Sequence, residues 1–333
     1  MILHIFNPSH EEALGFGSPY YVPTKAAQRL TVERCTLPLL WAKPGDAILI
    51  PDEYLRTEIT INHVTLLYKR EFTPKIIERI TEIKPWGWNA YLRHSLRRMG
   101  FKDHLLPTDQ YLNDLRTLSS RETAVKVLKQ LQDRHYLFEG ESQWCTNKED
   151  AWSAIKQYGT AMAKSPWSSS GRGVFRVEAV NNVFPAHERI ANIIKQYGGI
   201  SIEQYYQRLV DFAIEYNVTT EGKVLYIGIS IFKTSVGGNY IENIQGSQDE
   251  LHTLLNTHIA QSALEDTISI VGNTLQQYIR GAYEGPLGVD MMVIQTNTGV
   301  RIHPCVEINF RNTMGHVAIF REQQSYLPKR HET

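Results

Sequence analysis

The sequence has few cysteines and no long apolar run, and each of these absences excludes a class of protein. The three cysteines in 333 residues are far apart, and none belongs to a Cys-x-x-Cys pair. Their number and spacing argue against a disulfide framework and against a zinc site built on thiolates. No run of about 18 apolar residues could span a bilayer, and the start of the chain lacks the basic and apolar segments of a secretion signal. We therefore expect a protein of the reducing cytoplasm.

The sequence also lacks an excess of charge of either sign, because 35 basic residues balance 35 acidic ones. A neutral chain has no overall field that attracts nucleic acid or an anionic membrane, so an anionic ligand has to be held by local groups. The basic residues between positions 93 and 102 recur at helical spacing, which is typical of the solvent-facing side of a helix. We expect neither nucleic acid nor a membrane among the partners.

The length of 333 residues exceeds the size at which one core stops growing, about 250 residues, so two or three lobes with a cleft are expected. Apolar runs at residues 2–6 and 47–50 predict buried strands. Amphipathic periodicity predicts helices over residues 75–83 and 89–99, the second capped by Asn89 and ended by Gly100. This alternation indicates a small α/β lobe over residues 1–105.

Two further helices are predicted before the first segment with chemistry in it. The first covers residues 119–132 and has Ser120 as its N-cap. The second covers residues 147–158, and we expect a capping box between Thr146 and Glu149 at its start.

A loop rich in serine and glycine follows, between predicted strands at residues 160–164 and 174–177. Glycines let a backbone approach a ligand closely, hydroxyls and free N–H groups bind phosphate oxygens, and the preceding Lys164 adds positive charge. By itself such a loop is more often an exposed connection, and it is not a Walker loop because no Gly-Lys-Ser/Thr opens a helix. The loop residues concerned are Ser168, Ser169, Ser170, Gly171 and Gly173.

The strongest signal is a hairpin with oxygen-bearing side chains in apolar strands. The turn at residues 296–299 marks its tip. With a regular ladder from that turn, Asp290 is expected opposite Cys305 and diagonal to Glu307. Side chains alternate along a strand, so Glu307 and Asn309 share one face. The strands are predicted over residues 287–295 and 300–310.

Carboxylates in such strands are costly unless their charge is compensated. Mg²⁺ is held by one or two carboxylates together with substrate phosphates, and it would offset the charge on both sides. The alternative is a strand whose polar face meets water. Arg311 lies on the same face, and because arginine binds anions with two hydrogen bonds it favours a site for metal and anion.

Taken in order, these motifs resemble those of the ATP-grasp superfamily, which includes biotin carboxylase, D-alanyl-D-alanine ligases and formate-dependent enzymes of purine synthesis. The resemblance covers about residues 105–320. Lys164 and its loop are similar to a lysine and a flexible loop that lie over the ATP phosphates. Arg121 takes the place of a lysine that reaches ATP from the start of an upstream helix.

The resemblance implies an adenine and ribose site in the segment that begins ISIEQYY. Glu203 and the backbone of the three residues after it would face the adenine. Asp211 would bind the ribose hydroxyls, with Glu215 as the alternative. The three residues after Glu203 are Gln204, Tyr205 and Tyr206.

The same resemblance implies the metal site and the catalytic residues. Asp290, Glu307 and Asn309 would hold Mg²⁺, with Glu307 bridging two ions and Mn²⁺ as a substitute. Arg311 is similar to an arginine beside the carboxylate or bicarbonate substrate of carboxylases. Arg311 and Lys164 are therefore the implied catalytic residues.

The implied α+β fold has two lobes that clasp ATP, preceded by a small α/β lobe that helps to form the acceptor site. We place these lobes at residues 1–105, 106–200 and 201–333. Family members are often dimeric, and the sequence leaves open whether this chain forms a homodimer.

The implied activity is ligation, in which ATP activates a small carboxylate as an acylphosphate that an amine or similar nucleophile then captures. Two alternatives stay open. One is a kinase that phosphorylates a small alcohol or acid, and the other is an ATP-binding module without catalysis. The sequence does not identify the acceptor.

Overall fold

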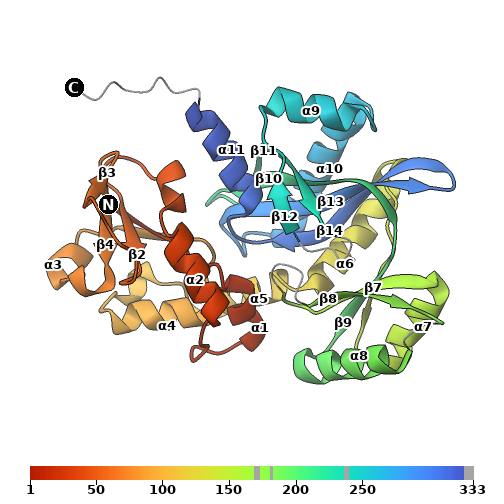
Figure 1. Cartoon of the computed structure of the whole chain (residues 1–333), viewed down its shortest axis with the longest axis horizontal. Coiled ribbons are helices and arrows are strands. Elements are labelled where there is room, and N and C mark those ends of the chain that lie inside the picture. Colours follow the sequence, from red (N-terminus) through yellow and green to blue (C-terminus); the bar gives the residue numbers. More distant parts are fainter. Residues whose placement is uncertain (169–172, 181–182, 236–239, 326–333) are drawn as a thin grey trace. The chain divides into compact units, whose positions relative to one another are not determined.

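The computed structural model describes residues 1–168, 173–180, 183–235 and 240–325 (Figure 1). The chain divides into two compact units. The first unit contains Met1–Arg116 and the last segment from Gln323, and the second unit contains Thr117–Glu322. The three lobes predicted from the sequence remain a prediction, because they follow a different division.

The first unit is built on a sheet of five strands in the order β3-β4-β2-β1-β5. Strand β1 pairs parallel with β2 and with β5, β2 pairs parallel with β4, and β3 closes the edge antiparallel to β4. The strands are β1 (Ile2–Ile5), β2 (Ala47–Ile50), β3 (Thr60–Ile61), β4 (Val64–Tyr68) and β5 (Glu82–Pro85). The helices are α1 (His10–Phe16), α2 (Lys25–Arg34), α3 (Pro74–Ile77), α4 (Ala90–Arg98) and α5 (Asp109–Leu118), whose last two residues lie beyond the boundary.

Both faces of this sheet are buried. Ala47 and Leu49 of β2 enter one apolar cluster, whereas Ile48 and Ile50 enter another on the opposite face. A parallel sheet with both faces covered is expected to have such continuously apolar strands. The α/β arrangement predicted for this part of the chain is confirmed.

One helix predicted here is wrong. The predicted helix at residues 75–83 ends at Ile77, and Glu82–Pro85 instead forms β5 beside β1. Burial alternates along β5, with Ile83 inside, so the apolar spacing that suggested a helix belongs partly to a strand. Pairing with the edge of β1 supplies hydrogen bonds that a sequence pattern does not reveal.

The second unit contains two antiparallel sheets. The smaller sheet has the order β6-β9-β7-β8 and the larger one β12-β11-β10-β13-β14. The strands are β6 (Ser142–Cys145), β7 (Thr160–Lys164), β8 (Val174–Glu178), β9 (Ile200–Gln204), β10 (Gln207–Val218), β11 (Val224–Thr234), β12 (Tyr240–Asn243), β13 (Gly285–Thr296) and β14 (Gly299–Asn309). The helices are α6 (Arg121–Leu131), α7 (Lys148–Tyr158), α8 (Val183–Tyr197), α9 (Gln248–Asn256), α10 (Gln261–Ile279) and α11 (Met314–Ser325), which ends beyond the boundary.

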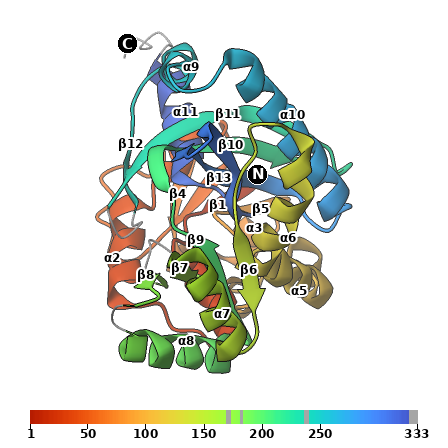
Figure 2. The ribbon, with the colours of Figure 1, turned by 90° about the vertical axis from the view of Figure 1, so that its right-hand side faces the viewer.

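Helices cover one face of each sheet in the second unit (Figure 2). Ala154 and Ile155 of α7 and Ile190 of α8 pack in one cluster with Ala163 and Ile202 of the small sheet. Helix α6 contacts β14 of the large sheet and also β6 and β9 of the small one. Helix α6 is therefore held where the two sheets approach each other.

The caps of two predicted helices can be compared with the structure. Ser120 caps α6 as predicted, since its Oγ accepts from the N–H of Glu122 at 3.2 Å. For α7 the predicted capping box is wrong, because Asn147 is the N-cap and its Oδ1 accepts from the N–H of Asp150 at 2.8 Å. The asparagine one residue later satisfies the first turn in place of Thr146.

The hairpin of β13 and β14 has its turn where the sequence predicts it, but its register differs. Asp290 lies opposite Glu307, not opposite Cys305, because the ladder shifts between Asp290 and Met292. Pro304 lies within the irregular stretch of β14. Proline has no N–H to donate, and prolines inside sheets are found at bulges. The bulge therefore brings the two carboxylates into direct opposition.

The three cysteines, Cys35, Cys145 and Cys305, are buried free thiols. Burial raises the pKa of both the Cys35 and Cys145 thiols to about 11. None of the helices in the described part of the chain is long and apolar enough to cross a membrane.

Candidate functional site

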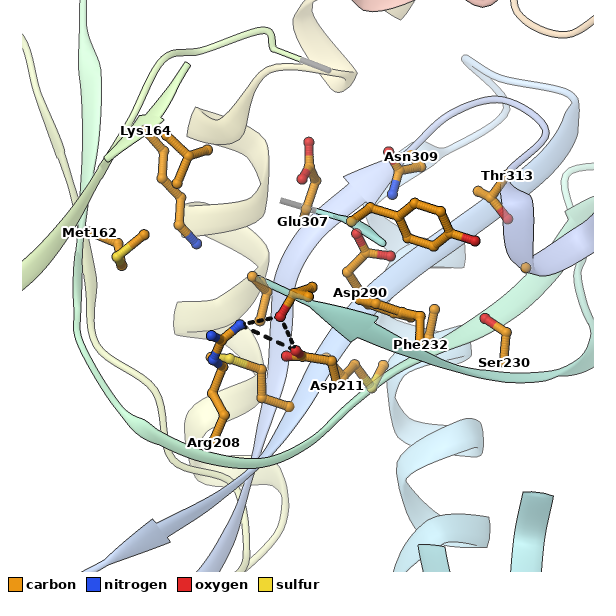
Figure 3. Close-up of a pocket in the computed structure, with 18 of the residues that line it drawn as sticks. Met162, Lys164, Arg208, Asp211, Ser230, Phe232, Asp290, Glu307, Asn309 and Thr313 are labelled. Carbon is orange, nitrogen blue, oxygen red and sulfur yellow. Dashed lines mark hydrogen bonds and ion pairs between the residues drawn. The ribbon is translucent and has the colours of Figure 1, made fainter. Parts of the chain in front are cut away.

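A pocket in the second unit is lined by both sheets and by the starts of α6 and α11 (Figure 3). It brings together most of the residues predicted from the sequence, although they are spread over almost 200 positions of the chain. These are Arg121, Lys164, Glu203, Gln204, Tyr205, Tyr206, Asp211, Asp290, Glu307, Asn309 and Arg311.

The serine-glycine loop is described only in part. Ser169, Ser170 and Gly171 lie outside the described residues, whereas Ser168 lines the pocket. Gly173 is not a lining residue. Its carbonyl accepts from the N–H of Ser165 at 2.8 Å, and a Cβ on it would come within 2.7 Å of the Ser168 side chain. Glycine is therefore needed there because the two ends of the loop lie close together.

Lys164 projects from the end of β7 and forms an ion pair with Glu203 of β9. Its Nζ donates to Glu203 Oε1 at 2.5 Å, and both side chains are almost fully buried. A buried ammonium or carboxylate is unfavourable without such a partner. The two charges predicted to contact phosphate and adenine therefore neutralise each other in this structure.

His303 lies behind Glu203 and is fully buried. Its Nε2 is 3.7 Å from Glu203 Oε2, and its ring meets that of Tyr206 edge-on. Burial lowers the pKa of His303 to about 4, despite the opposing effect of the Glu203 carboxylate. His303 is therefore neutral near pH 7, so Lys164 is the cation that neutralises the charge of Glu203.

Two carboxylates face each other across β13 and β14. Burial raises the pKa of Asp290 well above its ordinary value, and the negative charges of Glu307 and Glu215 raise it further. Glu307 Oε1 lies 3.0 Å from Arg121 Nη2. Asn309 lies on the same face of β14, and its Oδ1 accepts from Arg311 Nη2 at 2.9 Å.

This group of oxygens is suited to a hard cation. Burial raises the pKa of Asp290 most and the neighbouring carboxylates raise it further, and a divalent ion would offset both effects. Within the described ranges, no three His, Cys, Asp or Glu side chains group as metal ligands. A metal here would therefore be held by two carboxylates, an amide and oxygens of a bound phosphate, which is a donor set that Mg²⁺ accepts.

Arg121 connects the start of the loop with the carboxylates. Its Nε donates to the carbonyl of Ser165 at 3.0 Å, and its Nη2 donates to Ser168 Oγ at 3.2 Å. The same Nη2 pairs with Glu307. This position, between a candidate phosphate loop and a candidate metal ligand, fits a cation that contacts the nucleotide phosphates.

Arg311 is half-buried beside Asn309. Desolvation lowers the pKa of Arg311 to about 10, so the guanidinium stays charged at pH 7. Its Nη1 donates to the carbonyl of Asn312 at 2.8 Å, which fixes its orientation. An oriented, desolvated guanidinium in the pocket lining is a binding group for a carboxylate or phosphate.

Asp211 lies in a small network that the sequence did not predict. Its Oδ2 accepts from Thr234 Oγ1 at 2.5 Å and from Arg208 Nη1 at 3.2 Å (Figure 3). Burial raises the pKa of Asp211. Glu215, the alternative to Asp211 for the ribose, also lines the pocket, but its neighbours are Ser230 and His316.

Several lining residues were missed by the sequence reasoning. Met162 precedes Lys164 by two positions on β7, and strand alternation could have placed it on the same face. Arg208 could have been found as a charged residue at the start of the strand that carries Asp211. The missed residues include Met162, Arg208, Ser230, Phe232, Met292 and Thr313.

No model of a protein family matches the sequence, and no curated protein matches it either. Solved structures do match. The biotin carboxylase domain of Hydrogenobacter thermophilus 2-oxoglutarate carboxylase aligns with a TM-score of 0.56 and 12% identity, covering 97% of this chain and 68% of that one. Biotin carboxylase from Campylobacter jejuni aligns with a TM-score of 0.55 and 15% identity, covering 96% and 67%.

D-alanyl-alanine synthetase A from Vibrio cholerae aligns over more of its own length, with 99% of this chain and 94% of that one covered, a TM-score of 0.51 and 12% identity. At such low identities the likeness shows a shared fold. The fold predicted from the motifs is thereby confirmed.

Proposed function

Starting from a chain that has the ATP-grasp fold, we propose an ATP- and Mg²⁺-dependent ligase that activates a small carboxylate and joins it to an amine or similar nucleophile. The observation that carries this proposal is a single pocket that contains Lys164, Arg311 and the three oxygen ligands. These residues come from β7, β13, β14 and the segment that follows β14. A cation for phosphate, a metal site and a cation for a second anion are the parts that phosphoryl transfer to a carboxylate needs.

The nucleotide would lie along β9 and β7. Met162 and Tyr206 supply apolar surface beside Glu203, which suits an adenine ring with an amino group to donate. Lys164 and Arg121 would exchange their present carboxylate partners for phosphate oxygens. Asp211, held by Thr234 and Arg208, would accept from the ribose hydroxyls.

Asp290, Glu307 and Asn309 would hold Mg²⁺, which when bound neutralises charge on the phosphates and on the transferring group. Arg311 would orient the carboxylate substrate toward the γ-phosphate. Buried cations of fixed orientation need no rearrangement as charge develops, so they lower the barrier more than solvent does.

The reaction would proceed in two steps. A carboxylate oxygen attacks the γ-phosphorus, the bond to the ADP oxygen breaks, and an acylphosphate forms. The nitrogen of the acceptor then attacks the acyl carbon, phosphate leaves, and the nitrogen loses a proton. No side chain is required as nucleophile, so the protein contributes positioning and charge.

Two of the matching structures carry ligands that support this proposal. The Hydrogenobacter domain was solved with MgADP and with bicarbonate, and the Campylobacter enzyme was solved as a β,γ-ATP complex. A nucleotide, a magnesium ion and a small carboxylate-like anion are the ligands that we assign to the pocket of this chain.

The test is release of ADP and phosphate in the presence of Mg²⁺ and pairwise panels of carboxylic acids and amino acids. We expect at least one pair to give phosphate and a new amide, and the combined Asp290→Ala and Glu307→Ala variant to be inactive. Activity that survives in that variant would refute the proposal. A stable phosphorylated product without a new amide would identify a kinase in place of a ligase.

A further inference from the structure

A buried carboxylate, that of Glu215, borders the pocket, and its negative charge is one of those that act on Asp290. Its side chain on β10 is only 1% exposed. Ser230 of β11 donates to Glu215 Oε1 at 3.3 Å, and both residues line the pocket. An ionised carboxylate at this depth is unfavourable unless donors or cations satisfy both of its oxygens. The surroundings of the second oxygen therefore decide whether the protein satisfies this carboxylate or leaves it to bind a ligand.

The second oxygen, Oε2, lies 3.0 Å from His316 Nδ1, but the rest of the network argues against a hydrogen bond there. His316 Nε2 is 3.2 Å from the carbonyl of Tyr216, so Nε2 carries the proton and donates. Nδ1 in turn accepts from the backbone N–H of Thr313 at 3.3 Å. In this tautomer Nδ1 presents a lone pair, and two acceptors face each other.

The start of α11 holds this tautomer in place. The N–H of His316 donates to Thr313 Oγ1 at 3.1 Å, while the N–H of Thr313 donates to the imidazole. This reciprocal arrangement is that of a capping box, with histidine in the third helical position. Glu215 Oε2 is accordingly one of the buried atoms in the described part of the chain that have no hydrogen-bond partner.

Two backbone positions lie so close to the Glu215 carboxylate that only glycine fits at them. A Cβ on Gly315 would overlap Glu215 Oε1, and a Cβ on Gly288 would come within 2.5 Å of Oε2. Gly315 itself lines the pocket. Two glycines thus allow the chain to pass close to a carboxylate that lines the pocket together with Ser230 and Gly315.

We propose that Glu215 is the counter-ion for the ammonium group of the acceptor, so that the acceptor is a small primary amine. An ammonium has three N–H donors and no acceptor, and the groups at this end of the pocket are a carboxylate oxygen without a donor and the hydroxyls of Ser230 and Thr313.

The position of this subsite agrees with the order of the reaction. In Figure 3, Asp290 and Glu307 lie between Lys164 on one side and Ser230 and Thr313 on the other. An ammonium has no free electron pair, so the nitrogen held beside Ser230 would first pass one proton to the Glu215 carboxylate. It would then attack the acyl carbon from the side away from the nucleotide, and phosphate would leave. The inference rests on the proposed ligase function and adds the chemical class of its acceptor.

The experiment is isothermal titration of the protein, saturated with ADP and Mg²⁺, with the twenty common amino acids, ethylammonium and putrescine. The α-hydroxy acids, in which a hydroxyl replaces the ammonium group, serve as matched ligands without the charge. The variants are Glu215→Gln and, as a control, Glu265→Gln, an exposed glutamate of α10. In Glu215→Gln the new amide can donate to His316 Nδ1, so we expect the fold to be retained and the thermal midpoint to stay the same or to rise.

We expect at least one amine to bind the wild-type protein, and Glu215→Gln to weaken it at least tenfold while ADP and α-hydroxy acid affinities change less than twofold. The control should bind the amine as the wild-type protein does. Equal amine binding in Glu215→Gln, or no binding by any amine, would overturn the subsite alone. A thermal midpoint that falls with joint loss of ADP and amine binding would make Glu215 a structural residue. Failure of the wild-type protein to bind ADP and Mg²⁺ would instead refute the ligase function.

Discussion

The ion pair between Lys164 and Glu203 shows how one contact combines stability with function. The two charges are buried together. Lys164→Met should abolish measurable ADP binding and, by leaving Glu203 unpaired, lower the free energy of unfolding by about 3–5 kcal/mol. The double variant Lys164→Met, Glu203→Gln removes both charges. It should regain most of the stability without regaining ADP binding.

Urea unfolding and calorimetric titration with ADP measure the two effects separately. If the double variant were as unstable as Lys164→Met, the loss would arise from packing and not from an unpaired charge.

His303 predicts a dependence of stability on pH. Its pKa is about 4 in the folded protein and about 6.5 in the unfolded chain. Well above pH 6.5 His303 is neutral in both the folded and the unfolded protein, so it does not make stability depend on pH. As the pH falls toward 4 the unfolded chain binds the proton first, so stability is lost, by roughly 3 kcal/mol in all.

Denaturation curves between pH 4 and pH 8 measure this loss, and His303→Gln should show a smaller one over the same range. An unchanged slope in the variant would mean that other groups cause the loss.

At the scale of elements, the N-cap of α7 is a place where the sequence prediction and the structure differ. Asn147→Ala should lower the free energy of unfolding by about 1 kcal/mol, because the first turn loses its side-chain acceptor. Thr146→Ala should change it by less than about 0.5 kcal/mol, as for other exposed surface positions. Thermal unfolding of the two variants provides the measurement. If Thr146→Ala were the more destabilising of the two, the capping box predicted from the sequence would be correct after all.

Elements with a strong local signal were predictable from the sequence. The helix of Ser120 and the strands at residues 47–50 and 160–164 needed only an N-cap or an apolar run with turn residues beside it. The register of the last hairpin was not predictable by counting from the turn, since the bulge at Pro304 adds residues to one strand only. The short β5 was also missed, because its pairing partner β1 lies some 80 residues earlier in the chain.

The candidate site was predictable to the extent that it depends on ordered motifs. Lys164 and the Glu307, Asn309 and Arg311 series stand out by type and spacing, and the pocket contains all of them. Glu215 and Ser230 carry no such signal, because each looks like an ordinary polar residue in a strand. Their meaning depends on which neighbours the sheet provides.

At the scale of the whole molecule, all the residues that line the pocket belong to the second unit. ADP with Mg²⁺ should therefore slow amide hydrogen exchange in β7, β9, β13 and β14, because a ligand that binds only the folded state makes opening less favourable, by about 2.7 kcal/mol at one hundred times its dissociation constant. Peptides from β1 and β2 should exchange at unchanged rates. Mass spectrometry of exchanged peptides gives the measurement, and protection confined to the first unit would contradict the assignment of the pocket.

The three buried thiols have a practical consequence. Cys35, Cys145 and Cys305 are each no more than 2% exposed, and only the thiolate form reacts with alkylating reagents. The cysteines of the native protein should therefore react only very slowly with maleimide dyes. A cysteine introduced at the exposed tip of the β13–β14 hairpin, as in Thr298→Cys, would then carry a single fluorophore without any need to remove the natural ones.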